Sequence, residues 1–249
     1  MRATARRKVQ RSAPGHHAMP RQSRLHIAGI PQHVVLRGNN RQPCFFRDQD
    51  YLTYLAQLHD AARTHDCQVH AYVLMTNHVH LLMTGGEESS IPKTMQTLGR
   101  YVGYLNASYR RTGTSWEGHY KACLVDSDAY VLTCYRYIEL NPVRAAMVEE
   151  SAAHRWSSYQ TNALGIGDVL IAPHPTYMTL GPSDEERQAC YRSLFLDAIS
   201  DDRLQEIRAY LHQQRALGSP RFQQAVEAQL QQAATVRPRG RPSRRPTIG

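Results

Sequence analysis

The sequence predicts an α+β protein in which an antiparallel, ferredoxin-like sheet carries helices on one face and is followed by a C-terminal helical extension. Two observations lead to this fold class. Between residues 32 and 141 the predicted elements follow the order β-α-β-β-α-β and then a helix. Both helices inside that order have a single apolar stripe, which a sheet would cover. We expect a basic arm over residues 1–19, a main domain over 20–160, a helical extension over 161–234 and a basic tail over 235–249.

The first part of the predicted sheet consists of short apolar runs separated by turn residues. Gln32 to Arg37 is typical of a strand, and the Gly38-Asn39-Asn40 sequence after it is typical of a turn. Residues 48–65 have the apolar spacing of a helix that packs one face on a core. Two more strands are expected over residues 68–74 and 78–84, joined by a short turn.

The second part of the main domain repeats this alternation. Apolar residues recur at spacings of three and four from Ile91 to Tyr109, which predicts one amphipathic helix of about five turns. A short strand is expected over residues 121–125. The helix after it is expected to begin at residues 126–127 and to end just before Pro142, because proline disfavours helical geometry in the preceding residue.

The extension is predicted from weaker helical patterns. Ser183 stands three residues before Glu186, which is the spacing of a capping box at a helix N-terminus. Residues 204–211 and 222–230 also show helical spacing, with a Gly-Ser-Pro sequence between them. Two interpretations stay open: these helices cover the main domain, or they form a small DNA-binding module.

Composition excludes several classes of protein. No apolar run approaches the roughly 20 residues of a membrane span, and the arginine-rich N-terminus lacks the apolar core of a secretory signal. The five cysteines are odd in number and contain no CxxC pair, so neither a disulfide framework nor a thiolate zinc site is indicated. We therefore expect a cytoplasmic protein.

The net charge of +9 is distributed unevenly along the chain. Residues 1–47 hold ten Lys and Arg and no acid, whereas residues 48–234 hold more acidic than basic residues. Within residues 91–125, basic side chains that include Arg100 and Lys121 alternate with tyrosines and a tryptophan. This pattern suits a nucleic-acid strand, whose phosphates pair with the cations while its bases stack, and it equally suits a solvated helix face with core aromatics.

The C-terminal tail is basic and contains no acid over residues 235–249. Its Arg-Gly-Arg-Pro sequence, with Arg239 and Arg241, has the core of an AT-hook, whose arginines enter the narrow minor groove of A·T-rich duplex DNA. Such tails are also common as solvated chain ends, so both interpretations stay open.

His78 and His80 are the strongest candidates for a functional site. One residue separates them in a predicted strand, so both imidazoles lie on one face, where they could hold a divalent metal ion. Tyr137 and Asn141 stand four residues apart and share a face of the helix that follows. Two neutral imidazoles and an amide oxygen suit Mg²⁺ or Mn²⁺ on a phosphate, and a phenol can attack phosphorus.

Four motifs follow one another between residues 19 and 159. They are Pro20-Arg21 with Val34-Val35-Leu36-Arg37-Gly38-Asn39-Asn40, Val73-Leu74-Met75-Thr76-Asn77-His78-Val79-His80-Leu81-Leu82, Trp116-Glu117-Gly118-His119-Tyr120-Lys121 and Tyr137-Ile138-Glu139-Leu140-Asn141-Pro142-Val143-Arg144. In this order and at these separations they resemble one known family, the single-tyrosine HUH transposases of the insertion sequence 200-like type, and within it the REP-associated tyrosine transposases.

The resemblance implies a transposase that cleaves and rejoins single-stranded DNA beside an imperfect palindrome through a 5′-phosphotyrosine intermediate. It implies that His78 and His80 are metal ligands, that Asn141 is a third ligand and that Tyr137 is the nucleophile. Because nearby loops of the family read a guide sequence at the hairpin foot, it also makes Arg37, Asn39, Asn40 and Arg41 candidate DNA contacts. The expected partner is a REP-like DNA hairpin, and the chain would act as a monomer or a dimer.

Two other functions stay open from the sequence. The chain could be a nucleic-acid-binding regulator that keeps the fold without catalysis, or a metal-dependent hydrolase that uses an activated water. The predicted helix that carries Tyr137 also contains Tyr130 and Tyr135. Tyr135 points away from the face of the helix that carries Tyr137 and is interpreted as a packing residue.

Overall fold

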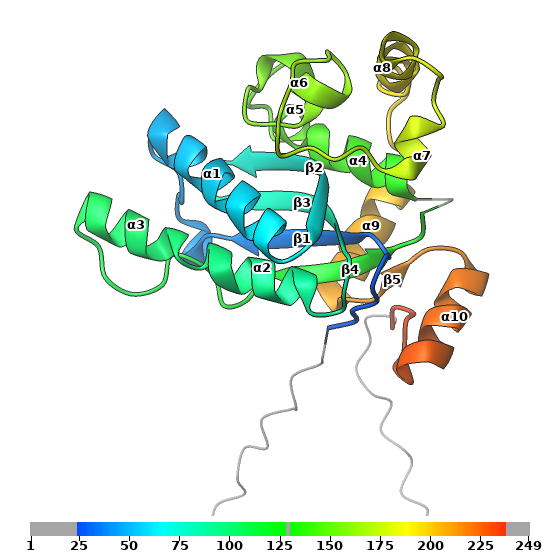
Figure 1. The fold of residues 1–249 in the computed structure, drawn as a ribbon, viewed down its shortest axis with the longest axis horizontal. Coiled ribbons are helices and arrows are strands. Elements are labelled where there is room, and N and C mark those ends of the chain that lie inside the picture. The colour runs from blue at the N-terminus through cyan, green and yellow to red at the C-terminus, as the bar shows by residue number, and fades with distance from the viewer. Residues whose placement is uncertain (1–23, 128–129, 238–249) are drawn as a thin grey trace, which may run out of the picture.

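The computed structural model describes residues 24–127 and 130–237 (Figure 1). The basic arm over residues 1–19 lies outside the described residues, and so do Arg239 and Arg241 of the AT-hook-like sequence. Among the residues described, no helix is long and apolar enough to cross a membrane.

The centre of the fold is a five-stranded sheet in the order β2-β3-β1-β4-β5. Its strands are β1 (Gln32–Arg37), β2 (Cys67–Met75), β3 (His78–Gly85), β4 (Lys121–Val125) and β5 (Ala216–Leu217). The first four neighbours pair antiparallel, and their order is that of the predicted ferredoxin-like unit. The short β5, which was not predicted, adds a parallel strand at the β4 edge.

One face of the sheet is covered by the helices within the β-α-β-β-α-β unit, as predicted (Figure 1). These are α1 (Asp48–Thr64), α2 (Ser90–Leu98) and α3 (Tyr101–Tyr109). Buried side chains of the helices, among them Leu58 and Leu105, form one apolar cluster with strand residues of that face. Burial of these stripes is the main stabilising contribution of the layer.

Helices also cover the opposite face, which the expectation of helices on one face did not include. There α4 (Val131–Glu139) and α9 (Asp201–Gln213) pack on a second apolar cluster of strand residues. The physical reason is visible in β2, where every residue from Val69 to Met75 is buried. A strand segment that is apolar at every position except His70 needs cover on both faces.

Two predicted helices differ from those observed. The single helix over residues 91–109 is divided into α2 and α3 at Gly99, where the amide groups of Gly99 and Arg100 bond three residues back rather than four. This tight turn leaves no room for a side chain, because a Cβ at Gly99 would lie 2.9 Å from the carbonyl oxygen of Gln96. The next helix begins at Val131 rather than at residues 126–127.

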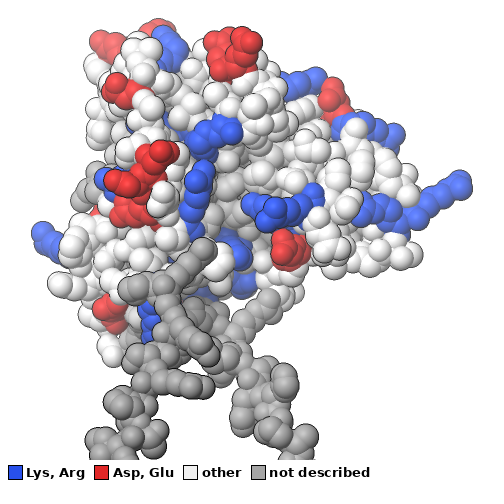
Figure 2. Space-filling model, turned by 180° about the vertical axis from the view of Figure 1, so that it is seen from behind, with Lys and Arg blue, Asp and Glu red and all other residues white. Residues whose placement is uncertain are grey.

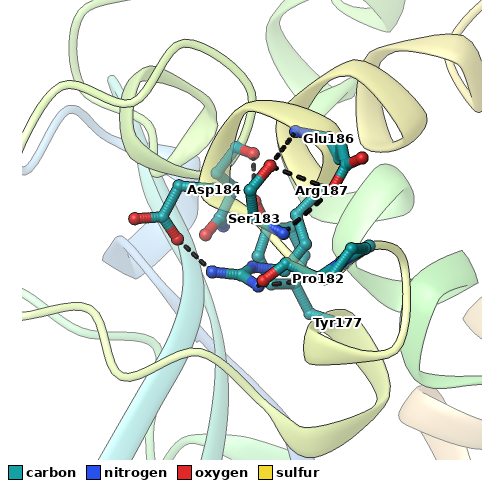
Figure 3. Close-up of polar contacts among 8 residues, drawn as sticks. Tyr177, Pro182, Ser183, Asp184, Glu186 and Arg187 are labelled. Atoms are coloured by element: carbon teal, nitrogen blue, oxygen red, sulfur yellow. Dashed lines mark hydrogen bonds and ion pairs between the residues drawn. The ribbon is translucent and has the colours of Figure 1, made fainter.

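The remaining elements are short or belong to the extension. The capping box at Ser183 is present: its hydroxyl accepts a hydrogen bond from the backbone N–H of Glu186, whose carboxylate accepts one from the backbone N–H of Ser183 (Figure 3). Arg187 of the same helix donates to the carbonyl oxygens of Gly181 and Pro182. The remaining helices and 3-10 turns are η1 (Asn39–Arg41), α5 (Asn141–Arg144), η2 (Ser151–Ala153), α6 (Tyr159–Asn162), α7 (Pro175–Met178), α8 (Asp184–Ser193) and α10 (Pro220–Leu230).

The extension packs directly on the sheet. The backbone N–H of Leu124 in β4 donates to the carbonyl oxygen of Arg215, and the Asp126 carboxylate accepts hydrogen bonds from the N–H and hydroxyl of Ser219. Of the two interpretations of these helices, the structure favours cover for the main domain.

Candidate nucleic-acid-processing site

The strand register gathers the candidate residues on one face of the sheet. His78 pairs with Arg37 of β1, and His80 pairs with Val35. Val35 also pairs with Lys121 of β4. Residues directly opposite in antiparallel strands point to the same face, so the two histidines and both cations lie together. This is the face that α4 and α9 cover.

A cavity of about 570 Å³ opens at this place. It brings together seven of the residues predicted from sequence: Arg37, Arg41, His78, His80, Lys121, Tyr137 and Asn141. It also contains residues that were not predicted, namely Glu117, His119, Arg208 and His212. Seen from behind, the molecule has Lys and Arg side chains across the middle of this face, which suits an anionic ligand (Figure 2).

Each histidine of the pair uses one ring nitrogen within the protein. The Nδ1 atom of His78 lies 2.7 Å from the Oδ1 atom of Asn77, and the Nδ1 atom of His80 lies 2.8 Å from the Nε2 atom of His33. Burial lowers the pKa of His78 to about 4, with a further contribution from the positive charge of Arg37. Burial also lowers the pKa of His80, so both imidazoles are neutral near pH 7 and could use Nε2 as a ligand.

His33 was not among the predicted site residues. It is fully buried, and burial together with the positive charge of Arg144 lowers its pKa to about 3. Its Nδ1 atom is buried without a hydrogen-bond partner among the described residues. The signal that could have found it is its position in β1, two residues before Val35 and therefore on the same face as His80.

Tyr137 projects from α4 onto the histidines. Its ring centroid lies 5.5 Å from that of His33 and 5.9 Å from that of His80, in both cases edge to face. The guanidinium carbon of Arg144 lies 4.4 Å from the Tyr137 ring centroid, and Arg144 also donates to the carbonyl oxygen of Tyr137. The helix is oriented by Val131, Cys134 and Ile138, which are completely buried against the sheet.

The neighbouring tyrosines have other contacts. The hydroxyl of Tyr135 accepts a hydrogen bond from the backbone N–H of His174, and the side chain is fully buried, which confirms its interpretation as a packing residue. Tyr130 donates to the carboxylate of Glu206 on α9. Neither tyrosine lines the cavity that holds His78 and His80.

Glu139 fixes the far side of the same helix. It is completely buried, and its carboxylate accepts hydrogen bonds from Ser158, Asn162 and Tyr191. Burial raises the pKa of Glu139 to about 7, although these three donors act in the opposite direction. The network joins the helix of Tyr137 to α6 and α8 of the C-terminal region.

The cavity contains two imidazoles and an amide that could serve as ligands of a metal ion. No group of three or more His, Cys, Asp and Glu side chains suited to a metal ion occurs within residues 24–127 and 130–237. The third donor would have to be an amide oxygen. Asn141 lines the cavity and uses its amide nitrogen to donate to the carbonyl oxygens of Tyr137 and Ile138, so its Oδ1 atom fits that role.

Of the other predicted DNA contacts that the structure describes, two lie next to cavity residues in the chain and one lies apart from the cavity. Asn39 and Asn40 are exposed in η1, directly between Arg37 and Arg41 in the chain, and Asn40 adopts a left-handed conformation with φ of 51°. Arg100 does not reach the cavity, because it lines a separate hollow beside α1 with Asp60 and other residues.

Residues 27–141 match the family described as "Transposase IS200 like". This part of the chain is similar to the IS200-like transposases, a family of enzymes that act on DNA. No curated protein compared with the chain matches it.

Two solved structures are similar. One is described as the REP-associated tyrosine transposase bound to a REP hairpin; it shares 16% identity, with 63% of this chain and 93% of that chain covered and a TM-score of 0.49. The other is a protein of Deinococcus radiodurans R1 described as a transposase, with 19% identity, 48% and 95% covered and a TM-score of 0.35.

Proposed function

We propose that this chain cleaves and rejoins single-stranded DNA beside a hairpin through a phosphotyrosine formed on Tyr137. The observation that supports the proposal is the contact of the Tyr137 ring with His80 and His33 inside a cavity that also holds Arg37 and Lys121. A phenol, two neutral imidazoles and flanking cations together suit phosphoryl transfer.

The reaction proceeds by exchange of one ester for another. The Tyr137 oxygen forms a bond to phosphorus, the bond from phosphorus to the 3′ oxygen breaks, and the phenolic proton ends on the released 3′-hydroxyl. The 5′ end stays attached to Tyr137, and attack by a 3′-hydroxyl reverses these changes and restores the phenol. Glu117 and His119 line the same cavity, and in this proposal they carry the proton.

His78, His80 and Asn141 would hold Mg²⁺ or Mn²⁺, which would polarise the phosphate and offset its charge in the transition state. The chain's own residues do the rest. Arg37, Arg41 and Lys121 attract the strand, and Arg144 orients the Tyr137 ring through its contact with the ring and the backbone.

The proposed partner is a DNA hairpin of the REP type with a short unpaired foot. Asn39 and Asn40 are exposed beside the cavity, where they can contact bases of that foot, since amide side chains read base edges. The Arg239 and Arg241 sequence would add a contact to A·T-rich duplex, and the chain would act as a monomer or a dimer.

The test is a denaturing-gel assay for a covalent adduct between the protein and end-labelled single-stranded hairpin DNA. Mg²⁺, Mn²⁺ or EDTA is added, and the hairpin comes from the flanks of the gene. We expect a metal-dependent adduct that Tyr137→Phe abolishes while hairpin binding is kept. Tyr130→Phe is the matched control, because this tyrosine lies on the N-terminal side of the same helix and contacts Glu206 instead of the histidines.

The same assay separates the other functions. Cleavage that survives in Tyr137→Phe but is lost in His78→Ala would indicate a hydrolase that uses water. Hairpin binding without cleavage or adduct under any metal condition would indicate a binding protein. Either result would remove the phosphotyrosine mechanism.

A further inference from the structure

An exposed aromatic ring stands among arginines at the junction of α1 and α3. Phe46 is 47% exposed, although large apolar side chains are usually buried. Its ring centroid lies 4.6 Å from that of Tyr109, and the guanidinium carbon of Arg111 lies 5.7 Å from it. The guanidinium carbon of Arg47 lies 5.5 Å from the Tyr109 ring. We call Phe46, Arg47, Tyr109 and Arg111 the Phe46 cluster.

A buried carboxylate holds the cluster in place. One carboxylate oxygen of Asp50 accepts hydrogen bonds from the backbone N–H groups of Phe46 and Arg47, at 2.8 and 3.1 Å, and from the hydroxyl of Tyr109 at 2.7 Å. Its other oxygen accepts from the hydroxyl of Tyr104 at 2.9 Å. Burial would raise the pKa of Asp50, but these hydrogen bonds lower it, so the carboxylate stays ionised. The ring of Phe46 is therefore preorganised on the surface.

The charge of the surroundings is positive. Residues 89–116 contain no Asp or Glu, and Arg110 and Arg111 form no ion pair with any described residue. The acid nearest in sequence to the ring, Asp48, is paired with Arg155 at 2.8 Å. Within the cluster, Arg47 lies 3.7 Å from the Asp50 carboxylate, whereas the guanidinium of Arg111 beside the ring is unpaired among the described residues. An aromatic ring with an unpaired guanidinium group beside it suits a ligand that has both a flat base and a phosphate.

The cluster lies at the same end of the sheet as the histidines. The backbone N–H of Cys44 donates to the carbonyl oxygen of Thr76, in the turn that leads into His78. The backbone N–H of Asn39 donates to the carbonyl oxygen of Ser115, so the loop after α3 also meets η1. The start of α1 and the end of α3 are both at the left of the view (Figure 1).

We propose that the Phe46 cluster is a base-stacking subsite for the unpaired DNA strand that passes out of the cavity. A base stacks on the exposed part of Phe46, while Arg111 contacts an adjacent phosphate. The subsite rests on the proposed function, because the strand that it holds is the one cleaved at Tyr137. The subsite also gives a role to part of the basic and aromatic stretch over residues 91–125. Tyr101, Trp116 and Tyr120 of that stretch are core residues, whereas Tyr109 packs against the exposed ring of Phe46.

The test compares binding of a labelled single strand with binding of the matching duplex by fluorescence anisotropy, with Tyr137→Phe as the parent protein so that no cleavage occurs. We expect Phe46→Ala to weaken single-strand binding about 5- to 100-fold and to leave duplex binding unchanged, because only unpaired bases can stack. Phe46→Trp should restore it. Leu52→Ala is the matched control, since Leu52 lies on α1 and is 48% exposed.

The arginine contact has its own readout. Arg111→Gln should reduce the slope of log affinity against log salt for the single strand by about 0.7, the value for one lost phosphate contact. Arg63→Gln, an exposed arginine in the last turn of α1, should leave the slope unchanged.

The outcomes distinguish the subsite from the proposed function. If the parent binds the strand and Phe46→Ala binds it equally well, or loses duplex binding to the same extent, the subsite is wrong and the function stands. If the parent binds no single strand, the proposed function fails together with the subsite.

Discussion

The Nε2 atom of His33 lies 2.8 Å from the Nδ1 atom of His80, and both imidazoles are buried against the edge of the Tyr137 ring. Because burial keeps both rings neutral, only one proton lies between these two nitrogen atoms. If His80 is to present the lone pair of Nε2 to the cavity, that proton must be on its own Nδ1, with His33 as the acceptor. In that tautomer, His33 is the acceptor that holds the His80 proton on Nδ1.

We predict that His33→Leu weakens Mn²⁺ binding about 10- to 100-fold, which is the usual effect of losing the partner that orients a metal-binding histidine. His33→Gln keeps an acceptor for the Nδ1–H group and should retain more of the affinity. Calorimetric titration of Mn²⁺ into the DNA-free protein measures this directly. Equal Mn²⁺ affinity for His33→Leu and wild type, with unchanged thermal unfolding, would show that the pair has no role in metal binding.

Arg144 is expected to support the chemistry at Tyr137. Its guanidinium lies over the Tyr137 ring, and burial lowers its pKa to about 10, so it remains charged. We predict that Arg144→Gln slows adduct formation at least about tenfold, because a positive charge near the transferred phosphate is lost. Arg136→Gln is the control on the same helix, since Arg136 donates to the carbonyl oxygen of Asp197 instead. A single-turnover adduct rate equal to wild type would contradict the role.

Glu139 gives the protein a stability that depends on pH. Its pKa is about 7 in the folded protein and 4.5 in an ordinary environment, so the folded state retains a proton that the unfolded state releases. The associated stability is present below pH 4.5 and is lost as the pH rises to about 7, on the order of 3 kcal/mol in all. We predict that Glu139→Gln removes this part of the pH dependence, as measured by urea unfolding at several pH values. If the free energy of unfolding varied with pH in the same way for wild type and Glu139→Gln, Glu139 would not be the source of this pH dependence.

The extension is expected to contribute to DNA affinity through Arg208. This residue is exposed on α9 and lines the cavity of the histidine pair. We predict that Arg208→Gln lowers the salt dependence of single-strand binding by about 0.7, as for one phosphate contact. Arg221→Gln, which lies on α10 and lines none of the described cavities, should behave as wild type. Equal slopes for the two variants would exclude Arg208 from the DNA path.

The bounds of the first four strands were predictable because local patterns determine them. Strand β1 has its predicted bounds, and the other three differ by at most one residue at either end. The break at Gly99 was not predicted, because an apolar stripe continues across it and hides a change of helix geometry. The second helical layer could have been predicted from the segment Val69 to Met75, which is apolar except for His70 and does not alternate as a half-exposed strand does.

Part of the clustering was predictable from neighbours in the sequence. A two-residue spacing puts His78 and His80 on one face of a strand, and a four-residue spacing puts Tyr137 and Asn141 on one side of a helical segment; all four line one cavity. Arg208 and His212 join them from about seventy residues further along the chain, through the packing of α9 on β4. No local pattern encodes a contact over that distance, so only the folded structure could reveal it.

The two-residue strand β5 has a consequence for any attempt to isolate the part of the chain that matches the transposase family. By pairing with Leu124 and Val125 it caps the exposed edge of β4, which would otherwise present free backbone groups to another molecule. A protein ending at residue 160 would lack both β5 and α9. Such a fragment would be prone to self-association through its uncovered sheet edge. The extension therefore covers the edge of β4 as well as lining part of the cavity.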